Sequence, residues 1–216
     1  MKLHLIWDMD GTLVDSEPEI LATIQKSLHA IGLSLKQASR PLRIGPPLPE
    51  VLRNSFSKDV LSEEQIREVI KGFRKIYDSS EFVDTRPFDG INEIIKSPKY
   101  IHHVITNKPD FATRRIIEKK GWSQDIVDVL SPNTLIAEMG RQMKKPELFQ
   151  YFKIRNPYIK VVGIGDMAGD AACAQAAGIP AIGVLWGTGT KEELEQAGCD
   201  SIVGNVDELK ESLMFF

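Results

Sequence analysis

Short apolar runs alternate with segments of helical periodicity in the part of the chain that follows Gly90. Apolar runs rich in β-branched residues are typical of strands, and the segments between them are typical of helices. The predicted strands are Leu3–Trp7, Ile101–Ile105, Val127–Leu130, Val161–Ile164, Ala181–Leu185 and Ser201–Val203. This alternation indicates an α/β fold in which helices cover both faces of a parallel sheet.

A long, mostly helical stretch separates the first predicted strand from the others. Glu19–Ile31 carries apolar residues at helical spacing. Ser62, with a glutamine three residues later, predicts a capping box at the start of a second helix. We therefore expect a sheet domain made of residues 1–14 and 84–216, with a helical insert at residues 15–83.

The composition of the 216 residues is that of a globular protein, with 42% hydrophobic and 26% charged residues. The net charge is only −3 and no long basic run is present, so we expect neither nucleic acid nor a membrane as a partner. Cys173 and Cys199 are the only cysteines, which favours a reducing cytoplasm over a disulfide framework. No stretch is typical of a signal peptide or a membrane span. A monomer is the default state, with a dimer as the alternative.

Residues with useful chemistry lie at the predicted strand ends. Ligands of an open parallel sheet bind outside the carboxyl ends of its strands, so we expect these residues to converge on one crevice. They are Asp8, Asp10 and Gly11 after the first strand, Thr106, Asn107 and Lys108 after the second, Lys144 and Lys145 before the fourth, and Asp166 and Asp170 after it.

Phosphoryl transfer needs such a set of residues. A carboxylate such as Asp8 can attack phosphorus and divide the reaction into two easier steps. A divalent cation is then needed between the carboxylate and the phosphate, and Mg²⁺ prefers oxygen ligands such as Asp8 and Asp166. Asp10 lies two residues after Asp8, so it can serve as general acid for the leaving group and then as base for water.

The phosphate oxygens need fixed donors. Thr106, Asn107, Lys145 and the N–H groups of the turn at Gly11 are the candidates. Lys145 is favoured over its neighbour Lys144 because it directly precedes Pro146, although the sequence leaves both open.

The segment Asp8–Ser16 resembles the first motif of the haloacid-dehalogenase-like hydrolases. Thr106, Lys145 and Gly165-Asp166 with Asp170 match the second, third and fourth motifs of that family in order and approximate spacing. Ala176–Gly187 and Ile44–Leu48 look like the phosphoglycolate-phosphatase-like branch. The resemblance covers nearly the whole chain. The chain departs from the branch in two places: Met167 stands where Ser or Thr is common, and Lys145-Pro146-Glu147 lacks the second proline that often follows the motif lysine.

The resemblance implies a Rossmann-like three-layer core with strand order 5-4-1-2-3 and a small helical cap at the position of the insert. It implies Mg²⁺ as cofactor, held by the Asp8 carboxylate, the Asp10 backbone carbonyl and the Asp166 carboxylate. Asp170 would support these ligands or occasionally join them.

The expected activity is hydrolysis of a small phosphomonoester, resembling phosphoglycolate, through an aspartyl-phosphate intermediate. A sugar phosphomutase and a pyrophosphatase are alternatives on the same scaffold. A C–halogen hydrolase would need neither Asp10 nor Asp166, so their presence argues against it. A phospho-accepting signalling domain is the non-enzymatic alternative.

Other residues have weaker signals. Arg43 stands beside the stiff Gly45-Pro46-Pro47 segment, and we expect it either to be surface charge or to contact an acidic leaving group. His102 and His103 lack metal-ligand spacing, so we expect them at the surface and at a strand edge.

Overall fold

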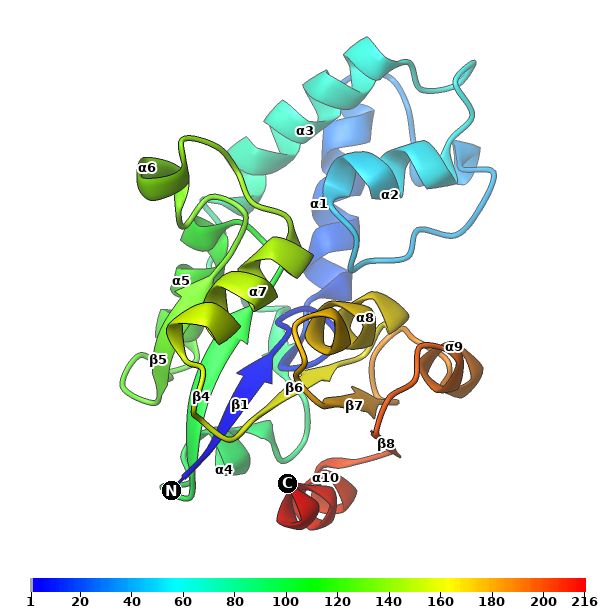
Figure 1. Ribbon diagram of the computed structural model, residues 1–216. Coiled ribbons are helices and arrows are strands. Elements are labelled where there is room, and N and C mark those ends of the chain that lie inside the picture. The colour runs from blue at the N-terminus through cyan, green and yellow to red at the C-terminus, as the bar shows by residue number, and fades with distance from the viewer. Residues whose placement is uncertain (1) are drawn as a thin grey trace. The chain divides into compact units, whose positions relative to one another are not determined.

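The computed structural model describes residues 2–216 (Figure 1). Two compact units make up this structure. The first unit contains the chain up to Asp15 together with Pro87–Phe216, and the second contains Ser16–Arg86. No helix of residues 2–216 combines the length and the hydropathy that a bilayer crossing requires.

A six-stranded parallel sheet forms the centre of the first unit. Its strands are β1 (Leu3–Trp7), β4 (Tyr100–Ile105), β5 (Ile126–Leu130), β6 (Val161–Gly165), β7 (Ala181–Val184) and β8 (Ser201–Val203). Their order is β5-β4-β1-β6-β7-β8. The first five predicted strands therefore follow the expected order, and the sixth adds β8 at the edge beside β7. The α/β prediction is confirmed.

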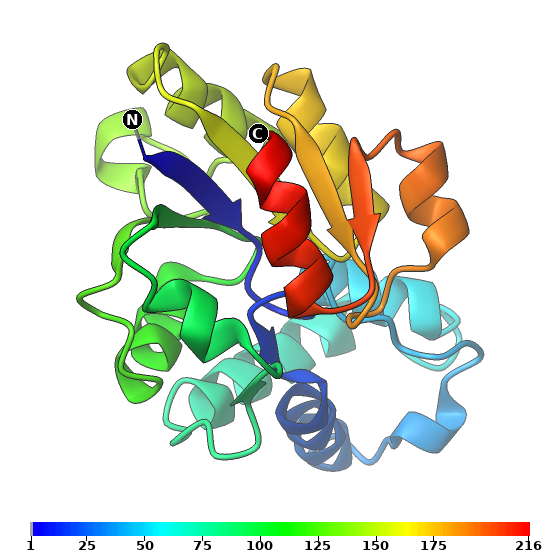
Figure 2. The same ribbon diagram turned by 90° about the horizontal axis from the view of Figure 1, so that it is seen from below.

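Helices cover both faces of this sheet (Figures 1 and 2). On one face lie α7 (Lys145–Arg155) and α8 (Ala168–Ala176), and on the other lie α4 (Ile91–Ile95) and α10 (Val206–Ser212). The remaining helices of the unit are α5 (Asp110–Lys119), α6 (Ile136–Met139), α9 (Lys191–Gln196) and the 3₁₀ helix Leu213–Phe215.

The core beneath α7 and α8 explains why the strands hold their register. Ile6 of β1 belongs to one buried apolar cluster with Phe149 and Phe152 of α7 and Ala174 of α8. Cys173 is a free cysteine and belongs to the same buried cluster. These apolar side chains fix the orientation of β1 and β6, whose ends carry the candidate site.

The prediction for His102 and His103 is wrong, since both lie inside the sheet domain, with side chains 1% and 7% exposed. Alternation along β4 directs His102 and His103 to opposite faces. The Trp7 indole N–H donates to His102 Nδ1 at 3.0 Å, and His103 Nε2 lies 2.9 Å from His4 Nδ1. Both histidines can be buried because each has a polar partner on the neighbouring strand β1. The polarity of the residues alone does not predict such partners.

The second unit is helical and contains α1 (Glu17–His29), a 3₁₀ helix (Leu35–Gln37), α2 (Leu48–Ser55) and α3 (Glu63–Tyr77). The predicted capping box is present at the start of α3. The Ser62 hydroxyl accepts the Gln65 amide at 3.3 Å, and the Gln65 side chain accepts the Ser62 amide at 2.9 Å. Where the chain passes between the units, β2 (Val14–Asp15) and β3 (Arg86–Pro87) form a separate two-stranded sheet.

Candidate active site

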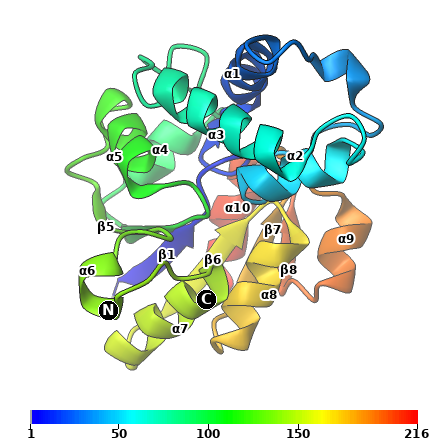
Figure 3. The same ribbon diagram turned by 90° about the horizontal axis from the view of Figure 1, so that it is seen from above.

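Three neighbouring strands deliver the principal residues of the site. Asp8 follows β1, Thr106 follows β4 and Asp166 follows β6. The strands are adjacent and parallel, so their carboxyl ends meet at one edge of the sheet, as Figure 3 shows from above. The Asp8 amide donates to the Ile164 carbonyl at 2.9 Å, which ties the ends of β1 and β6 together.

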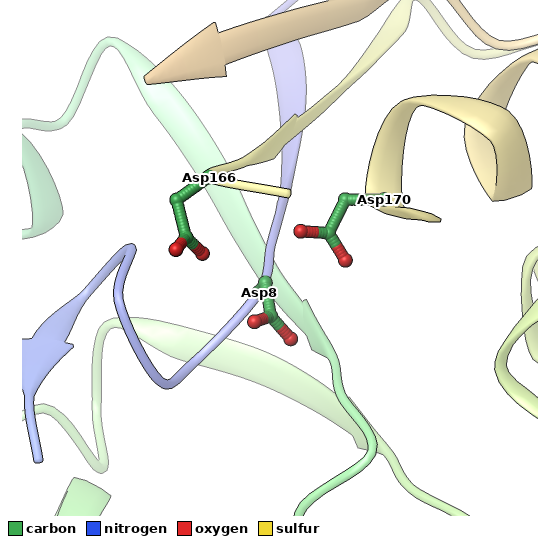
Figure 4. Close-up of side chains that lie close together, drawn as sticks. All are labelled: Asp8, Asp166 and Asp170. Carbon is green, nitrogen blue, oxygen red and sulfur yellow. The ribbon is translucent and has the colours of Figure 1, made fainter. Parts of the chain in front are cut away.

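Asp8, Asp166 and Asp170 form a buried carboxylate cluster. One carboxylate oxygen from each of the three lies within 4.8 Å of the others, and Figure 4 shows the three side chains close together. Asp170 comes from the first turn of α8, where its Oδ2 accepts the Met167 amide at 3.1 Å. Three oxygen donors so close together could hold a metal ion.

One ammonium group faces this cluster. Lys145 Nζ lies 2.5 Å from both Asp8 Oδ1 and Asp170 Oδ1, and the lysine is 5% exposed. Lys145 is the first residue of α7, whereas Lys144 precedes the helix and is exposed. The structure therefore brings Lys145, and not Lys144, to Asp8.

Burial dominates the electrostatics of the cluster. It raises the pKa of the Asp8 carboxyl to about 7; the Lys145 ammonium opposes this rise, and Asp170 and Asp166 add to it. Burial also raises the pKa of Asp166. For Lys145, burial works to lower the pKa, but Asp170 and Asp8 outweigh it and raise the pKa above its usual range. One ammonium thus faces three carboxylates, a charge balance that favours an added cation.

Both oxygens of Asp166 are held by threonines. The Thr12 hydroxyl donates to Oδ1 at 3.1 Å, while Thr188 donates its amide to Oδ2 at 2.8 Å and its hydroxyl at 3.0 Å. The Trp186 indole N–H donates to the Thr12 carbonyl at 3.0 Å and so joins the two threonine segments. These hydrogen bonds fix the orientation of the Asp166 carboxylate. In the sequence, Trp186 and Gly187 belong to the segment that resembles the family branch, whereas nothing there marks Thr188 as a site residue.

Asp10 has a partner that the sequence did not identify. Lys108 Nζ lies 2.7 Å from Asp10 Oδ1 and 2.9 Å from Oδ2. Lys108 follows the second predicted strand, and the sequence alone assigns it no role. Its position next to Thr106 and Asn107 is the only sequence feature that places Lys108 near the site. The contact with Asp10 cannot be predicted from the sequence, because the two residues are 98 positions apart.

The predicted phosphate donors have different surroundings. Thr106 is 1% exposed, and its hydroxyl accepts the Lys108 amide at 3.2 Å, an arrangement in which it can still donate. Asn107 is half-buried in the same loop. The Gly11 amide donates to the Val14 carbonyl at 2.9 Å inside the turn, and phosphate binding by the N–H groups of this turn stays a prediction.

Gly11 has a different structural task. Its φ is +80°, and a Cβ atom there would overlap the Asp166 carboxylate. A glycine is therefore needed for the turn after β1 to approach Asp166. Arg43 lies in the second unit, where it is exposed, and its effect on selectivity stays a prediction.

The family model described as haloacid dehalogenase-like hydrolase matches residues 5–184. The chain belongs to the haloacid dehalogenase-like hydrolase family. The match spans all four motif segments, from Asp8 through Thr106 and Lys145 to Asp170. The haloacid dehalogenase-like assignment made from these segments is therefore confirmed.

Curated relatives extend this result. Phosphoglycolate phosphatase from Xylella fastidiosa is 29% identical over 195 residues, which cover 88% of this chain and 82% of the relative. Phosphoglycolate phosphatase from Xanthomonas campestris is 28% identical over 85% of this chain and 83% of the relative. Tyrosine-protein kinase PtkA from Mycobacterium tuberculosis is 26% identical over 97% of this chain and 72% of the relative.

Solved structures share the fold over the whole chain. A protein from Clostridium acetobutylicum described as a predicted phosphatase has a TM-score of 0.81 and 24% identity, with 100% of each chain covered. A haloacid dehalogenase-like hydrolase from Streptococcus pneumoniae has a TM-score of 0.82 and 19% identity, with 99% of this chain and 98% of that chain covered. The family, the relatives and the fold together indicate an enzyme of the phosphatase type.

Proposed function

We propose that this haloacid dehalogenase-like enzyme is a Mg²⁺-dependent phosphatase that hydrolyses a small phosphomonoester through an aspartyl-phosphate on Asp8. The observation that carries the proposal is the buried Asp8 carboxylate, 2.5 Å from Lys145 and grouped with Asp166 and Asp170. The three carboxylates would repel a phosphate, and the single ammonium does not balance their charge. The site can therefore bind a phosphate only if a further positive charge is present.

The donor set fits a magnesium ion. The cluster offers only carboxylate oxygens, which are the donors that Mg²⁺ prefers, and no thiol or imidazole belongs to it. Asp8 and Asp166 would hold the ion, with the Asp10 carbonyl as the third ligand that family membership suggests. When bound, the ion would neutralise charge on the phosphate and on Asp8.

The protein residues divide the reaction into two steps. In the first, an Asp8 oxygen forms a bond to phosphorus, the bond between phosphorus and the ester oxygen breaks, and Asp10, in its protonated form, gives its proton to the leaving oxygen and becomes a carboxylate. In the second, Asp10 takes a proton from water, the water oxygen bonds to phosphorus, the bond between phosphorus and the Asp8 oxygen breaks, and inorganic phosphate leaves. Lys145 and Thr106 would hold the phosphate oxygens through both steps.

The relatives named phosphoglycolate phosphatase support a small phosphorylated acid as the proposed substrate. We assign substrate selection to residues 16–86, the helical unit inserted after the first strand, because inserted elements commonly carry specificity on a shared scaffold. We propose a monomeric cytoplasmic enzyme. Two competing outcomes are transfer of the phosphoryl group to a sugar and transfer to a tyrosine. The second is the activity that the name of the relative PtkA suggests for that protein.

The test is phosphate release from phosphoglycolate, pyrophosphate, a sugar phosphate and a nucleoside monophosphate, each with Mg²⁺ and with EDTA. We expect Mg²⁺-dependent release that favours a small phosphorylated acid. Asp8→Asn should abolish turnover, and Asp10→Asn should lower it by roughly 10²–10⁴-fold. Turnover by Asp8→Asn would refute the mechanism, and a sugar-bisphosphate requirement would favour a mutase instead.

A further inference from the structure

The ion pair between Lys108 and Asp10 is a second buried charge centre, distinct from the carboxylate cluster. The side chains of Lys108 and Asp10 are only 4% and 13% exposed. Both carboxylate oxygens of Asp10 lie within hydrogen-bond distance of the same ammonium, at 2.7 and 2.9 Å. A surface lysine would gain little from such a pair, whereas a buried pair is held in one geometry because separation leaves charges without partners.

The backbone of Lys108 is itself anchored. Its amide donates to the Thr106 hydroxyl at 3.2 Å, and its carbonyl accepts the Thr113 hydroxyl at 3.3 Å. Pro109 follows directly and fixes the start of α5, where its carbonyl accepts the same Thr113 hydroxyl at 3.0 Å. Lys108 therefore extends from a rigid turn, and the position of its ammonium is set by β4 and α5 rather than by solvent.

This arrangement joins two proposed functions of the site. Thr106, a candidate phosphate donor, accepts the amide of Lys108, and Lys108 contacts the proposed acid–base group Asp10. We propose that Lys108 is a positioning residue that holds the Asp10 carboxylate in register with the phosphate-binding end of β4. The assignment rests on the proposed phosphatase function.

Positioning of a general acid has a specific kinetic signature. The leaving group of an alkyl phosphate such as phosphoglycolate is a basic alkoxide, so its departure needs the proton from Asp10. The nitrophenolate of p-nitrophenyl phosphate is a stable anion and leaves without that proton. A residue that acts through Asp10 therefore affects kcat/KM for the alkyl ester much more than for the aryl ester. A merely structural defect lowers both.

The experiment compares kcat/KM for phosphoglycolate and p-nitrophenyl phosphate in Lys108→Met, Asp10→Asn and the double variant. We expect Lys108→Met to lower the value for phosphoglycolate by about 10–100-fold, as for a modest displacement of a catalytic group. The value for p-nitrophenyl phosphate should change by less than about threefold, well below that positioning effect. In the Asp10→Asn background, Lys108→Met should cause no further loss, because the two residues act as one unit.

Two further variants complete the design. Lys108→Arg keeps a cation at this position and should recover part of the alkyl-ester activity. Lys144→Met removes a charge from the exposed lysine beside α7 and should leave both substrates unaffected. If Lys108→Met does not fold, Lys108→Arg and the uncharged double variant still give the comparison between substrates.

The outcomes separate the two proposals. An equal loss for both substrates, or a loss that adds to that of Asp10→Asn, would overturn the role of Lys108 and indicate direct contact with the substrate. Failure of the unmodified protein to release phosphate from any ester would overturn the phosphatase proposal, and the role of Lys108 with it. Selective, non-additive loss for phosphoglycolate would support both.

Discussion

The threonines that hold Asp166 allow a metal site to be tested without touching a ligand. Thr188→Val removes the hydroxyl that donates to Asp166 Oδ2 at 3.0 Å, while the amide of the same residue still donates at 2.8 Å. Valine has nearly the shape of threonine, so the change removes one hydrogen bond and little packing. We expect weaker binding of Mg²⁺ with the fold unchanged.

The magnitude follows from two considerations. A hydrogen bond to a charged group contributes about 1.5–3 kcal/mol, which equals roughly 10–100-fold in affinity if all of it were lost on metal binding. Thr188 makes this hydrogen bond without metal as well, so only the loss of Asp166 orientation weakens binding. We therefore expect about a tenfold increase in the Mg²⁺ dissociation constant, at the lower end of the range for partners of metal ligands.

Isothermal titration calorimetry with Mg²⁺ measures this change directly. Thr190→Val is the matched control, because Thr190 lies two residues away and its hydroxyl accepts the Glu193 amide at 3.2 Å at the start of α9. Loss of that cap should lower the free energy of unfolding by about 1 kcal/mol without changing Mg²⁺ affinity. Equal dissociation constants for the unmodified protein and Thr188→Val would refute the claim that Thr188 orients a metal ligand.

Three further outcomes follow from the structure. Burial lowers the pKa of His102 and His103 to about 4. Below pH 6.5 the unfolded chain therefore binds more protons than the folded protein. The free energy of unfolding should then fall as the pH drops toward 4, by at most about 3 kcal/mol for each histidine. Urea midpoints at pH 7.5 and 5 measure the fall, which His103→Leu should reduce and the exposed-site control His29→Gln should not. Ser62→Ala should lower the free energy of unfolding by about 1 kcal/mol in urea titration, with the same phosphatase activity. Ca²⁺ in place of Mg²⁺ should give little turnover, because its longer and looser coordination misplaces Asp8; equal rates would contradict this.

The sheet could be predicted from the sequence because its signals are local. Leu3–Trp7 and Ser201–Val203 were predicted with the bounds that the structure has, and the other strands differ by single residues at their ends. Most of these strands are short, mainly apolar runs that are bounded by turn residues or charges. The order of the strands came from the family resemblance, since hydrophobic periodicity does not define which strands are neighbours.

The partners within the site could not be predicted, since they depend on contacts between distant segments. Lys108 and Asp10 are 98 residues apart, and Thr188 meets Asp166 across a 22-residue separation. The burial of His102 has the same origin, because its partner Trp7 is on another strand. A polar residue inside a strand can be exposed or buried with a partner, and only the tertiary structure distinguishes the two.

The loop after β7 shows how tightly the carboxylate cluster is constrained. A Cβ atom at Gly187 would overlap the Gly11 carbonyl and Asp166, and one at Gly189 would overlap the Asp166 carbonyl. These glycines let the loop approach closely enough for Thr188 to reach Asp166 Oδ2. Gly187→Ala would therefore displace Thr188 together with the loop. It should weaken Mg²⁺ binding at least as much as Thr188→Val, because it removes the amide as well as the hydroxyl from Asp166. Calorimetry gives the Mg²⁺ dissociation constants of the two variants. Tighter Mg²⁺ binding by Gly187→Ala than by Thr188→Val would contradict the steric argument.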